Sequence, residues 1–595
     1  MEVPAHAPSP DGPVLIPGMR QSDPPSFQLA DVIVQTLVEL GIRHFCICPG
    51  SRSTPLVLNI WRDASASHTV HHDERSAAFQ ALGRSLATGN AAAVVTTSGT
   101  AVAELLPATV EASQSNVPLV LLTADRPARL RGTGSNQTIL QPGIFGPYVR
   151  AELDIPATVP DHGEWRRELS DQVTRLVNSA SGPRPGPIHL NAQFDKPFEP
   201  TDLVRRATAA CPMQESPGPH SRIYLSDEVR SALTQSRQGL IIVGPNRIGP
   251  PMLDAVHALS VSAAMPIVAD PLSGCRFPAG TRCNVVSHAD ALLQAGLLED
   301  LQPDLIVRFG SLPVSTRLIA WWSDRLADAG THIYVNDTGE VHDDTNAITM
   351  YVAGDPVGFC HEAGKLQHPV VARQGWLSRW QERNALAERT VQTCLAASPL
   401  WDLGAVRTLI ERLGPNTILV AGNSLPIRLL DSAGIGLRDG VMFGNRGASG
   451  IDGLLATALG VSGATSHQVV LLLGDVSMLH DMGSLVEVRR QNVANLCIVV
   501  LNNDGGRIFE RLPVTELADV AEQLFVAPHG LDFAGLASAF GLDHRLVSEL
   551  SGLDRALSDS MDGPPASILE IRTSAAADLA QERHYIDLLR HAGAR

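Results

Sequence analysis

Two apolar runs in the last third of the sequence are each followed by polar residues that could bind a cation. Gly474-Asp475 follow the run QVVLLL (468–473), and Asn502-Asn503 follow the run LCIVVL (496–501). Both runs predict buried strands of a parallel sheet, where ligands collect at the carboxyl ends. If the strands are neighbours, about 4.8 Å apart, the Asp475 carboxylate, the Asn503 amide oxygen and the Gly505 carbonyl can hold one hard cation such as Mg²⁺. The alternative is that these residues only cap and turn the chain.

A second candidate, Glu74, begins a predicted helix within HHDERSAAFQALGRSLATG (71–89). The next turns of that helix are small or apolar, so burial would disfavour the carboxylate anion and raise its pKa. Such a carboxyl group is suited to sharing a proton with a nitrogen base. The alternative is an ordinary acidic residue stabilised by the helix dipole. His71 and His72 lack a spacing typical of zinc sites and are predicted to be structural.

The elements that must position these residues alternate between β-rich apolar runs and helical patterns. This alternation predicts an α/β fold of three consecutive open parallel-sheet domains. The domains are expected at residues 27–209, 210–395 and 396–595, after a flexible Pro-rich extension at 1–26. In the first domain we expect strands at 44–50, 91–99 and 118–125 and helices at about 27–40, 74–88 and 100–114.

Composition excludes several classes of partner. The 595 residues carry a net charge of −16, which is unfavourable for binding nucleic acid or an anionic membrane, and 44% apolar residues indicate globular domains. No apolar run approaches the roughly 18 residues of a membrane span, and the N-terminus lacks the order of a signal peptide. The eight cysteines are scattered without a CxxC pair, so we expect a cytoplasmic protein without disulfides or structural zinc.

The spacing around Asp475 resembles the diphosphate motif of thiamine diphosphate enzymes, GDG followed some twenty-five residues later by NN, although Val476 replaces the last glycine. The resemblance implies thiamine diphosphate held through Mg²⁺ or Mn²⁺ by Asp475, Asn503 and Gly505. It also implies that Glu74 contacts N1′ of the aminopyrimidine ring and favours the imino tautomer that removes the C2 proton. The first predicted domain would then bind the pyrimidine and the third the diphosphate and metal. In such enzymes these two domains usually come from different subunits, so a homodimer is the minimum assembly and a tetramer stays open.

Seven blocks, in order along the chain, resemble one family of these enzymes, the 2-succinyl-5-enolpyruvyl-6-hydroxy-3-cyclohexene-1-carboxylate synthase (MenD) family of menaquinone biosynthesis. The blocks are CPGSRSTPL (48–56), HHDERSAAFQALG (71–83), TSGTAVAELLPATVEA (97–112), LTADRPARLRGTGSNQTILQPG (122–143), GNSLPIR (422–428), GNRGASGIDG (444–453) and NNDGGRIFERLP (502–513). The resemblance implies that 2-oxoglutarate is decarboxylated and that the resulting enamine adds to isochorismate.

The same resemblance implies which residues contact the ligands. The two substrates bring four carboxylates, which an acidic protein must meet with local arginines. The implied substrate contacts are Arg52, Asn136, Gln137, Arg317, Ser424, Arg428 and Arg446, to which we add Arg126 at a strand end. Some relatives carry a lysine before the arginine at 317, where this chain has Thr316. The implied cofactor contacts include Ser424 and Ile451, and Ile508, Phe509 and Leu512 are expected to form an apolar wall or to be helix core.

Other functions remain open from the sequence. Another thiamine diphosphate-dependent 2-oxoacid decarboxylase or carboligase would share Glu74 and Asp475 but not the arginines. A relative that binds ligands without catalysis would have lost the acid or a metal ligand, yet Glu74, Asp475 and Asn503 are all present. The glycines of GNRGASGIDG do not form a GxGxxG after a strand, so a dinucleotide site is disfavoured. There is no positive signal for FAD in the middle domain.

Overall fold

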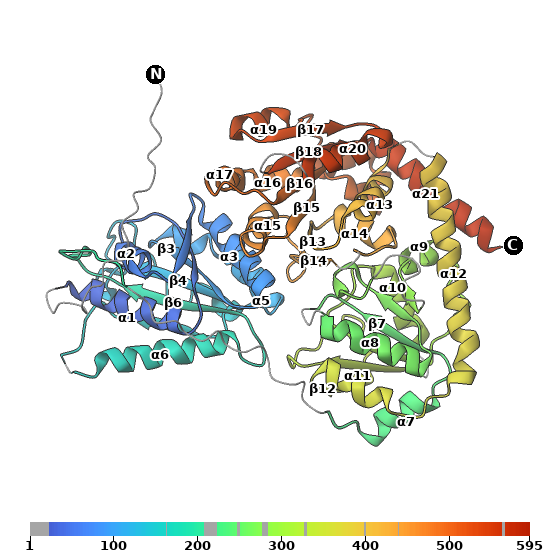
Figure 1. Ribbon diagram of the computed structural model, residues 1–595, viewed down its shortest axis with the longest axis horizontal. Helices are drawn as coiled ribbons and strands as arrows, with labels where there is room; N and C mark the ends of the chain where they lie inside the picture. The colour runs from blue at the N-terminus through green and yellow to red at the C-terminus, as the bar shows by residue number, and fades with distance from the viewer. Residues whose placement is uncertain are drawn as a thin grey trace. The chain divides into compact units, whose positions relative to one another are not determined.

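The computed structural model describes residues 23–161, 163–206, 223–246, 250–276, 284–326, 330–397, 400–437, 440–561 and 566–594 (Figure 1). By internal packing the chain divides into two compact units, Met1–Glu215 and Ser216–Arg595. Most of the predicted extension 1–26 lies outside the described residues, and helix α1 (Pro25–Glu39) begins slightly before its predicted start at residue 27. Within the described ranges no helix is long and apolar enough to cross a membrane.

The first unit contains a six-stranded parallel sheet with the order β2-β1-β3-β4-β6-β5. Its strands are β1 (His44–Ile47), β2 (Ser67–Val70), β3 (Ala92–Thr96), β4 (Leu119–Asp125), β5 (Glu152–Ile155) and β6 (Pro187–Gln193). The strands predicted at 44–50, 91–99 and 118–125 are confirmed as β1, β3 and β4. These runs were recognisable because β3 and β4 are buried along their whole length and read as nearly continuous apolar sequence.

Helices cover this sheet, and one of them differs from its prediction. Helix α1 packs against α2 (Thr54–Arg62) and α6 (Trp165–Ala180), while α3 (Glu74–Thr88) packs against β3 and α5 (Leu106–Gln114) (Figure 1). The helix expected at 100–114 is two helices, α4 (Thr100–Ala103) and α5. Pro107 lies in the first turn of α5, where its missing N–H is tolerated, whereas a continuous helix would lose a hydrogen bond there.

The second unit contains two further six-stranded parallel sheets. The central one, ordered β12-β11-β10-β7-β8-β9, has the strands β7 (Gly239–Val243), β8 (Ile267–Ala269), β9 (Val285–Val286), β10 (Leu305–Phe309), β11 (Thr331–Asn336) and β12 (Met350–Ala353). The last one, ordered β14-β13-β15-β16-β18-β17, has the strands β13 (Thr417–Ala421), β14 (Val441–Gly444), β15 (Gln468–Gly474), β16 (Leu496–Asn502), β17 (Asp543–Val547) and β18 (Ser567–Arg572). The predicted class of three consecutive parallel α/β sheets is confirmed, while the boundaries at 209/210 and 395/396 stay predictions.

The helices of the second unit connect and cover these sheets (Figure 1). They include α8 (Pro250–Ala263), α9 (Ala289–Gln294), α10 (Thr316–Leu326), α11 (Pro356–Gly364), α12 (Val370–Ala397), α13 (Asp402–Arg412), α14 (Leu425–Ser432), α15 (Leu454–Ser462), α16 (Asp475–His480), α17 (Leu485–Arg490), α20 (Leu550–Met561) and α21 (Ala575–Gly593). The long helix α12 contacts α9, which lies between two strands of the central sheet, and α21, which follows the last sheet. It therefore packs against helices of both sheets in this unit.

The first and last sheets have the same strand order when their strands are numbered within each sheet, 2-1-3-4-6-5. The order reverses between β1 and β3 in the first sheet and between β13 and β15 in the last. In open parallel sheets, the crevice at such a reversal is where ligands bind, because the two connections leave in opposite directions. This structural repeat has no counterpart in a short sequence repeat, and it marks one expected ligand position in each unit.

A charged cluster fastens α12 to α13. Glu388 forms an ion pair with Arg407 (2.6 Å) and a hydrogen bond with His288 (2.8 Å). Burial opposes the charge of Glu388, but the hydrogen bonds from His288 and Arg407 outweigh it and lower the pKa of Glu388 to about 2, from 4.5. The stabilisation is therefore present above pH 4.5 and is lost as the pH falls toward 2.

We expect Glu388→Gln to destabilise the protein by about 2 kcal/mol at pH 7, allowing for the partial exposure of the pair. The loss of stability caused by the substitution should become smaller as the pH falls below 4.5, because Glu388 then takes up a proton in the unfolded native protein, and in the folded protein only near pH 2. Denaturant melts at pH 7 and pH 4 test this expectation. The exposed pair Arg590–Asp587 supplies the control, since Asp587→Asn should change stability by less than about 0.5 kcal/mol. A difference that stays constant with pH would contradict the assignment.

Candidate functional site

The two strands expected to carry the cation ligands are neighbours. β15 pairs with β16 in parallel register, with Gly474 opposite Leu501. Asp475 is the first residue of α16, and Asn503 follows the last residue of β16. The two side chains therefore leave the same edge of the sheet, at the carboxyl ends of adjacent strands. The sequence predicted the two strand ends, and the structure shows that the strands are neighbours.

Asp475 is buried, with 2% of its surface exposed. Its Oδ2 accepts hydrogen bonds from the Gly505 backbone N–H (2.8 Å) and from His529 Nε2 (3.1 Å), and its Oδ1 accepts one from the Val476 N–H (2.7 Å). Burial raises the pKa of Asp475, and the hydrogen bonds from Gly505 and Val476 oppose that rise. A cation beside this carboxylate would favour its ionised form still further.

Asn503 and Gly505 complete the loop after β16. Asn503 is 7% exposed and donates from Nδ2 to Asp402 Oδ2 (2.9 Å), which leaves its Oδ1 as the end that could bind a cation. Gly505 has φ +116°, and a Cβ there would collide with the backbone oxygen of Val526. Only glycine fits this position. A carboxylate, an amide oxygen and a backbone carbonyl form an all-oxygen set that suits Mg²⁺ or Mn²⁺.

Within the described residues no cluster of three or more His, Cys, Asp or Glu side chains could hold a metal ion. The set at Asp475 differs from such a cluster because two of its three oxygens come from an amide and a backbone carbonyl.

Sequence reasoning missed His529, which lies 54 residues after its partner Asp475. The Leu531 N–H donates to His529 Nδ1 (3.0 Å), so Nδ1 is the acceptor and Nε2 carries the proton donated to Asp475. His529 therefore orients the carboxylate. The only sequence signal was a histidine between Pro528 and Gly530, which is too common an arrangement to be informative.

The loop after β13 lies at the reversal point of the same sheet. Ser424, just before α14, has φ +67° and ψ −125°, a conformation that costs a non-glycine residue on the order of 1–3 kcal/mol. Its neighbour Asn423 holds the loop by donating to the carbonyls of Asn445 (2.7 Å) and Gly450 (2.6 Å). Ile451, half-buried in the turn before α15, follows Gly450 directly, so this network brings the predicted Ser424 and Ile451 loops together.

Three of the predicted arginines gather near these loops. Arg428 Nη1 donates to the Ser424 carbonyl (2.7 Å), and Arg446 Nη1 donates to Asn423 Oδ1 (3.0 Å). Arg317 pairs with Asp290 (3.3 Å). Burial and then the charge of Arg446 lower the pKa of Arg428, and Arg317 adds to the effect. Mutual repulsion of this kind indicates cations collected in one place, which favours an anionic ligand.

The residues after the metal loop form a partly exposed apolar surface. Ile508 and Phe509 lie in a 3-10 helix (Arg507–Arg511) and are half-buried, and Phe509 meets the ring of Phe525 edge-on at 5.5 Å. Leu512 is 47% exposed, so the alternative that it is helix core is wrong. Ile508 does pack against the hydrophobic core.

In the first unit, Glu74 begins α3 as predicted. The helix is capped by Asp73, whose side chain accepts from the Ser76 N–H, and residues 76–83 are buried. Burial raises the pKa of Glu74, with smaller contributions from the charges of Asp73 and Glu104, against a hydrogen bond from its own backbone. The sequence expectation of a raised pKa is confirmed.

The remaining predicted residues of this unit lie around the ends of β1, β3 and β4. Arg126, 9% exposed, donates to Ser98 Oγ, and Gln137 Nε2 donates to the Ser98 carbonyl (3.0 Å). Arg52 donates to the Phe194 carbonyl (2.7 Å), and burial and the charge of Arg126 lower its pKa. Asn136 is exposed beside Gln137. The structure thus places Arg52, Arg126 and Gln137 in one neighbourhood.

Comparison with known protein families identifies one domain in each unit. A family model described as "Thiamine pyrophosphate enzyme, N-terminal TPP binding domain" matches residues 27–144. Another, "Thiamine pyrophosphate enzyme, C-terminal TPP binding domain", matches residues 440–571. Thiamine pyrophosphate is another name for thiamine diphosphate. The first match includes Glu74 and the second includes Asp475 and Asn503.

Curated relatives extend the likeness over nearly the whole chain. A protein of Roseiflexus sp. (strain RS-1) is 38% identical over 93% of this chain and 96% of its own length. Proteins of Rubrobacter xylanophilus (37%, covering 96% and 99%) and Halobacterium salinarum (35%, covering 94% and 97%) are similar. All three bear the name 2-succinyl-5-enolpyruvyl-6-hydroxy-3-cyclohexene-1-carboxylate synthase. This chain therefore belongs to the 2-succinyl-5-enolpyruvyl-6-hydroxy-3-cyclohexene-1-carboxylate synthase family of thiamine pyrophosphate enzymes.

Proposed function

We propose that this chain is an active thiamine diphosphate-dependent synthase that decarboxylates 2-oxoglutarate and adds the remaining four-carbon unit to isochorismate. The product would be 2-succinyl-5-enolpyruvyl-6-hydroxy-3-cyclohexene-1-carboxylate, with CO₂ released, as a step of menaquinone biosynthesis. The observation that carries the proposal is the position of Asp475 and Asn503 at adjacent strand ends, beside the reversal point of the last sheet.

The residues of the second unit would bind the cofactor's charged end. Asp475, Asn503 and Gly505 would hold Mg²⁺ or Mn²⁺, and the metal would neutralise the diphosphate. Ser424, Ile451, Ile508 and Phe509 would contact the rest of the cofactor from the surrounding loops. When bound, thiamine diphosphate supplies a carbon nucleophile that no protein side chain provides. The predicted domains 27–209 and 396–595 would be the pyrimidine-binding and diphosphate-binding domains.

Glu74 would act at the other end of the cofactor. Its raised pKa means that the carboxyl group can carry a proton near neutral pH more readily than an exposed glutamate. It would hold that proton at the pyrimidine ring nitrogen and thereby favour the tautomer that acts as the base.

The arginines would hold the substrate carboxylates. Arg52 and Arg126 lie together in the first unit, and Arg317, Arg428 and Arg446 in the second. A guanidinium group pairs with a carboxylate in a fixed geometry, and the partly buried setting strengthens the pair. Ser424, Asn136, Gln137 and Leu512 are proposed to complete the substrate contacts.

We expect Arg428→Ala to raise the KM for one of the two acidic substrates by about 10- to 100-fold, the effect of losing one charge-assisted hydrogen bond of about 1.5–3 kcal/mol. Steady-state kinetics with each substrate varied in turn would identify which substrate Arg428 contacts. Arg412→Ala is the matched control, because Arg412 pairs with Asp554 on the surface and should leave both KM values unchanged. An unchanged KM for both substrates in the Arg428 variant would remove this residue from the site.

The function itself is tested by turnover of 2-oxoglutarate with and without isochorismate. We expect formation of the joined product when both are present, measured by loss of isochorismate and release of CO₂. Steady CO₂ release at the same rate without isochorismate would instead favour the alternative, another thiamine diphosphate-dependent 2-oxoacid decarboxylase or carboligase. No turnover under either condition would favour a protein that only binds ligands.

We also propose a homodimer as the minimum assembly, with each site shared between subunits. Two features support it: Glu74 and Asp475 belong to different units of the chain, and the exposed apolar residues Leu512, Leu517 and Leu524 suit burial at an interface. Mixing the inactive variants Glu74→Gln and Asp475→Ala under conditions of subunit exchange should restore up to about a quarter of native activity, because half of the dimers would be mixed and each would hold one intact site. No recovery in exchanged dimers would place each site within one chain.

A cytoplasmic location is part of the proposal. The described cysteines, which are Cys46, Cys48, Cys275, Cys360, Cys394 and Cys497, are buried. Burial and the scattered spacing of the cysteines fit a reducing compartment. Fractionation of the source cells, followed by detection of the protein, would test the location.

A further inference from the structure

Asp402 has no assigned role, yet it is the partner of the Asn503 amide. It is the first residue of α13 and is 2% exposed. Its Oδ2 accepts a hydrogen bond from Asn503 Nδ2 (2.9 Å), and its Oδ1 accepts one from Thr573 Oγ1 (2.7 Å). Both oxygens of this buried carboxyl group are therefore engaged inside the protein, and one of them faces a proposed metal ligand.

The bond from Asn503 determines which way its amide faces. An asparagine amide has a donor end and an acceptor end, and only the oxygen can coordinate a cation. Because Asp402 binds the donor end, the Oδ1 of Asn503 lies on the opposite side of the amide. Among the described residues no hydrogen bond engages that oxygen. Without Asp402 the amide could turn by half a rotation and present its NH₂ group to the cation.

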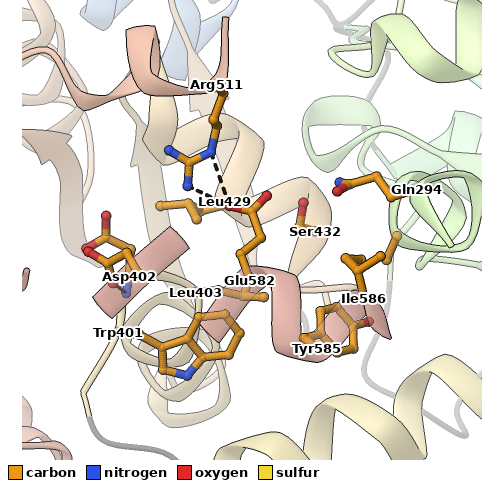
Figure 2. Close-up of a pocket in the computed structure, with 12 residues that line it drawn as sticks. Gln294, Trp401, Asp402, Leu403, Leu429, Ser432, Arg511, Glu582, Tyr585 and Ile586 are labelled. Atoms are coloured by element: carbon orange, nitrogen blue, oxygen red, sulfur yellow. Dashed lines mark hydrogen bonds and ion pairs between the residues drawn. The ribbon is translucent and has the colours of Figure 1, made fainter. Parts of the chain in front are cut away.

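Asp402 is itself held firmly by the C-terminal helix. Its backbone N–H donates to Asp578 Oδ1 in α21 (2.8 Å). One turn later in α21, Glu582 pairs with Arg511 (2.7 Å), the last residue of the 3-10 helix that carries Ile508 and Phe509. Figure 2 shows Asp402 and the Arg511–Glu582 pair on the wall of one cavity. Helix α21 thus holds both Asp402 and the 3-10 helix after the metal loop. A rigid support of this kind preserves ligand geometry.

We infer that Asp402 is a positioning residue that fixes the Asn503 amide with its oxygen toward the cation. The inference rests on the proposed function, since it requires the cation site of Asp475 and Asn503. Outer partners of metal ligands typically change metal affinity by about 10- to 100-fold when removed. This acidic residue lies 101 positions before Asn503, in a different element.

The test is Mn²⁺ binding to the full-length protein at saturating thiamine diphosphate, followed by electron paramagnetic resonance. Asp402→Ala should weaken Mn²⁺ binding by about 10- to 100-fold. Asp402→Asn should stay within about threefold of native, because its amide oxygen still accepts from Asn503 and its NH₂ can donate to Thr573. If the alanine variant does not fold, Asp402→Ser, whose side chain is too short to reach Asn503, should behave as the alanine variant was expected to.

A double-mutant cycle separates positioning from general destabilisation. In an Asn503→Ala background, replacing Asp402 by alanine should change Mn²⁺ affinity by no more than about threefold, since the amide it orients is gone. Asp578→Asn is the matched control, a change at a second buried carboxyl group that touches Asp402 but not Asn503, and it should leave Mn²⁺ affinity near native.

Two results would overturn the inference. One is native Mn²⁺ affinity in Asp402→Ala, and the other is an equal loss with and without Asn503, which would show a merely structural role. A different result would count against the proposed function instead: native Mn²⁺ affinity in Asn503→Ala alone would mean that the cation site is not at Asn503.

Discussion

Glu74→Gln is expected to bind thiamine diphosphate normally and to lose about 10²- to 10⁴-fold of the rate of product formation. Glutamine has nearly the same size and keeps the start of α3 intact, so the cofactor's surroundings are preserved. It has no acidic proton to share with the pyrimidine nitrogen, so the base at the reacting carbon would not form. The raised pKa of native Glu74, caused mainly by burial, is the property that the amide cannot reproduce.

The measurement is kcat for product formation beside cofactor affinity from a thermal shift titration. Glu104→Gln is the matched control: it removes a neighbouring exposed carboxylate whose charge adds to the raised pKa of Glu74, and it should retain activity within about threefold. Native activity in the Glu74 variant would refute its assignment. Loss of cofactor binding together with activity would mean that Glu74 serves binding and not proton sharing.

Asp475→Ala is expected to abolish the magnesium-dependent stabilisation of the protein by thiamine diphosphate. In the native protein, cofactor at a hundred times its Kd should stabilise the fold by about 2.7 kcal/mol. Asp475 is the only charged group among the three proposed ligands, and without it the cation would have no anionic protein oxygen to balance its charge. Melting curves with cofactor, with and without Mg²⁺, measure the effect.

Asp504→Asn is the control for this variant. Asp504 lies in the same loop at φ +65° and accepts from the backbone N–H groups of His529 (3.0 Å) and Gly530 (2.7 Å), all of which asparagine can reproduce. It should keep the cofactor-induced stabilisation. Chelation of the metal from native protein should mimic the Asp475 variant, and added Mg²⁺ should reverse it. An Asp475 variant that is still stabilised by cofactor and Mg²⁺ would place the cation elsewhere.

Much of the fold and part of the site were predictable because the relevant signals are local. Strands such as β15 and β16 are buried on both faces, so they read as unbroken apolar runs, and the polar residues that follow them mark their carboxyl ends. The start of α3 at Glu74 and its raised pKa followed from the small and apolar residues after it. The break between α4 and α5 was not predicted. Pro107 marks it, because proline is tolerated in the first turn of a helix and not in its interior, so a new helix begins there.

The sequence by itself determined that three parallel α/β sheets form, where the principal strands end, and that Asp475 and Asn503 stand at two such ends. Only the tertiary structure decided the strand order, the reversal points, and the partners His529 and Asp402, which lie 54 and 101 residues from the side chains they orient. The physical reason is that burial and strand ends produce patterns among residues that are close in the sequence. A hydrogen bond between distant segments depends instead on how whole sheets and helices pack, which no local pattern specifies.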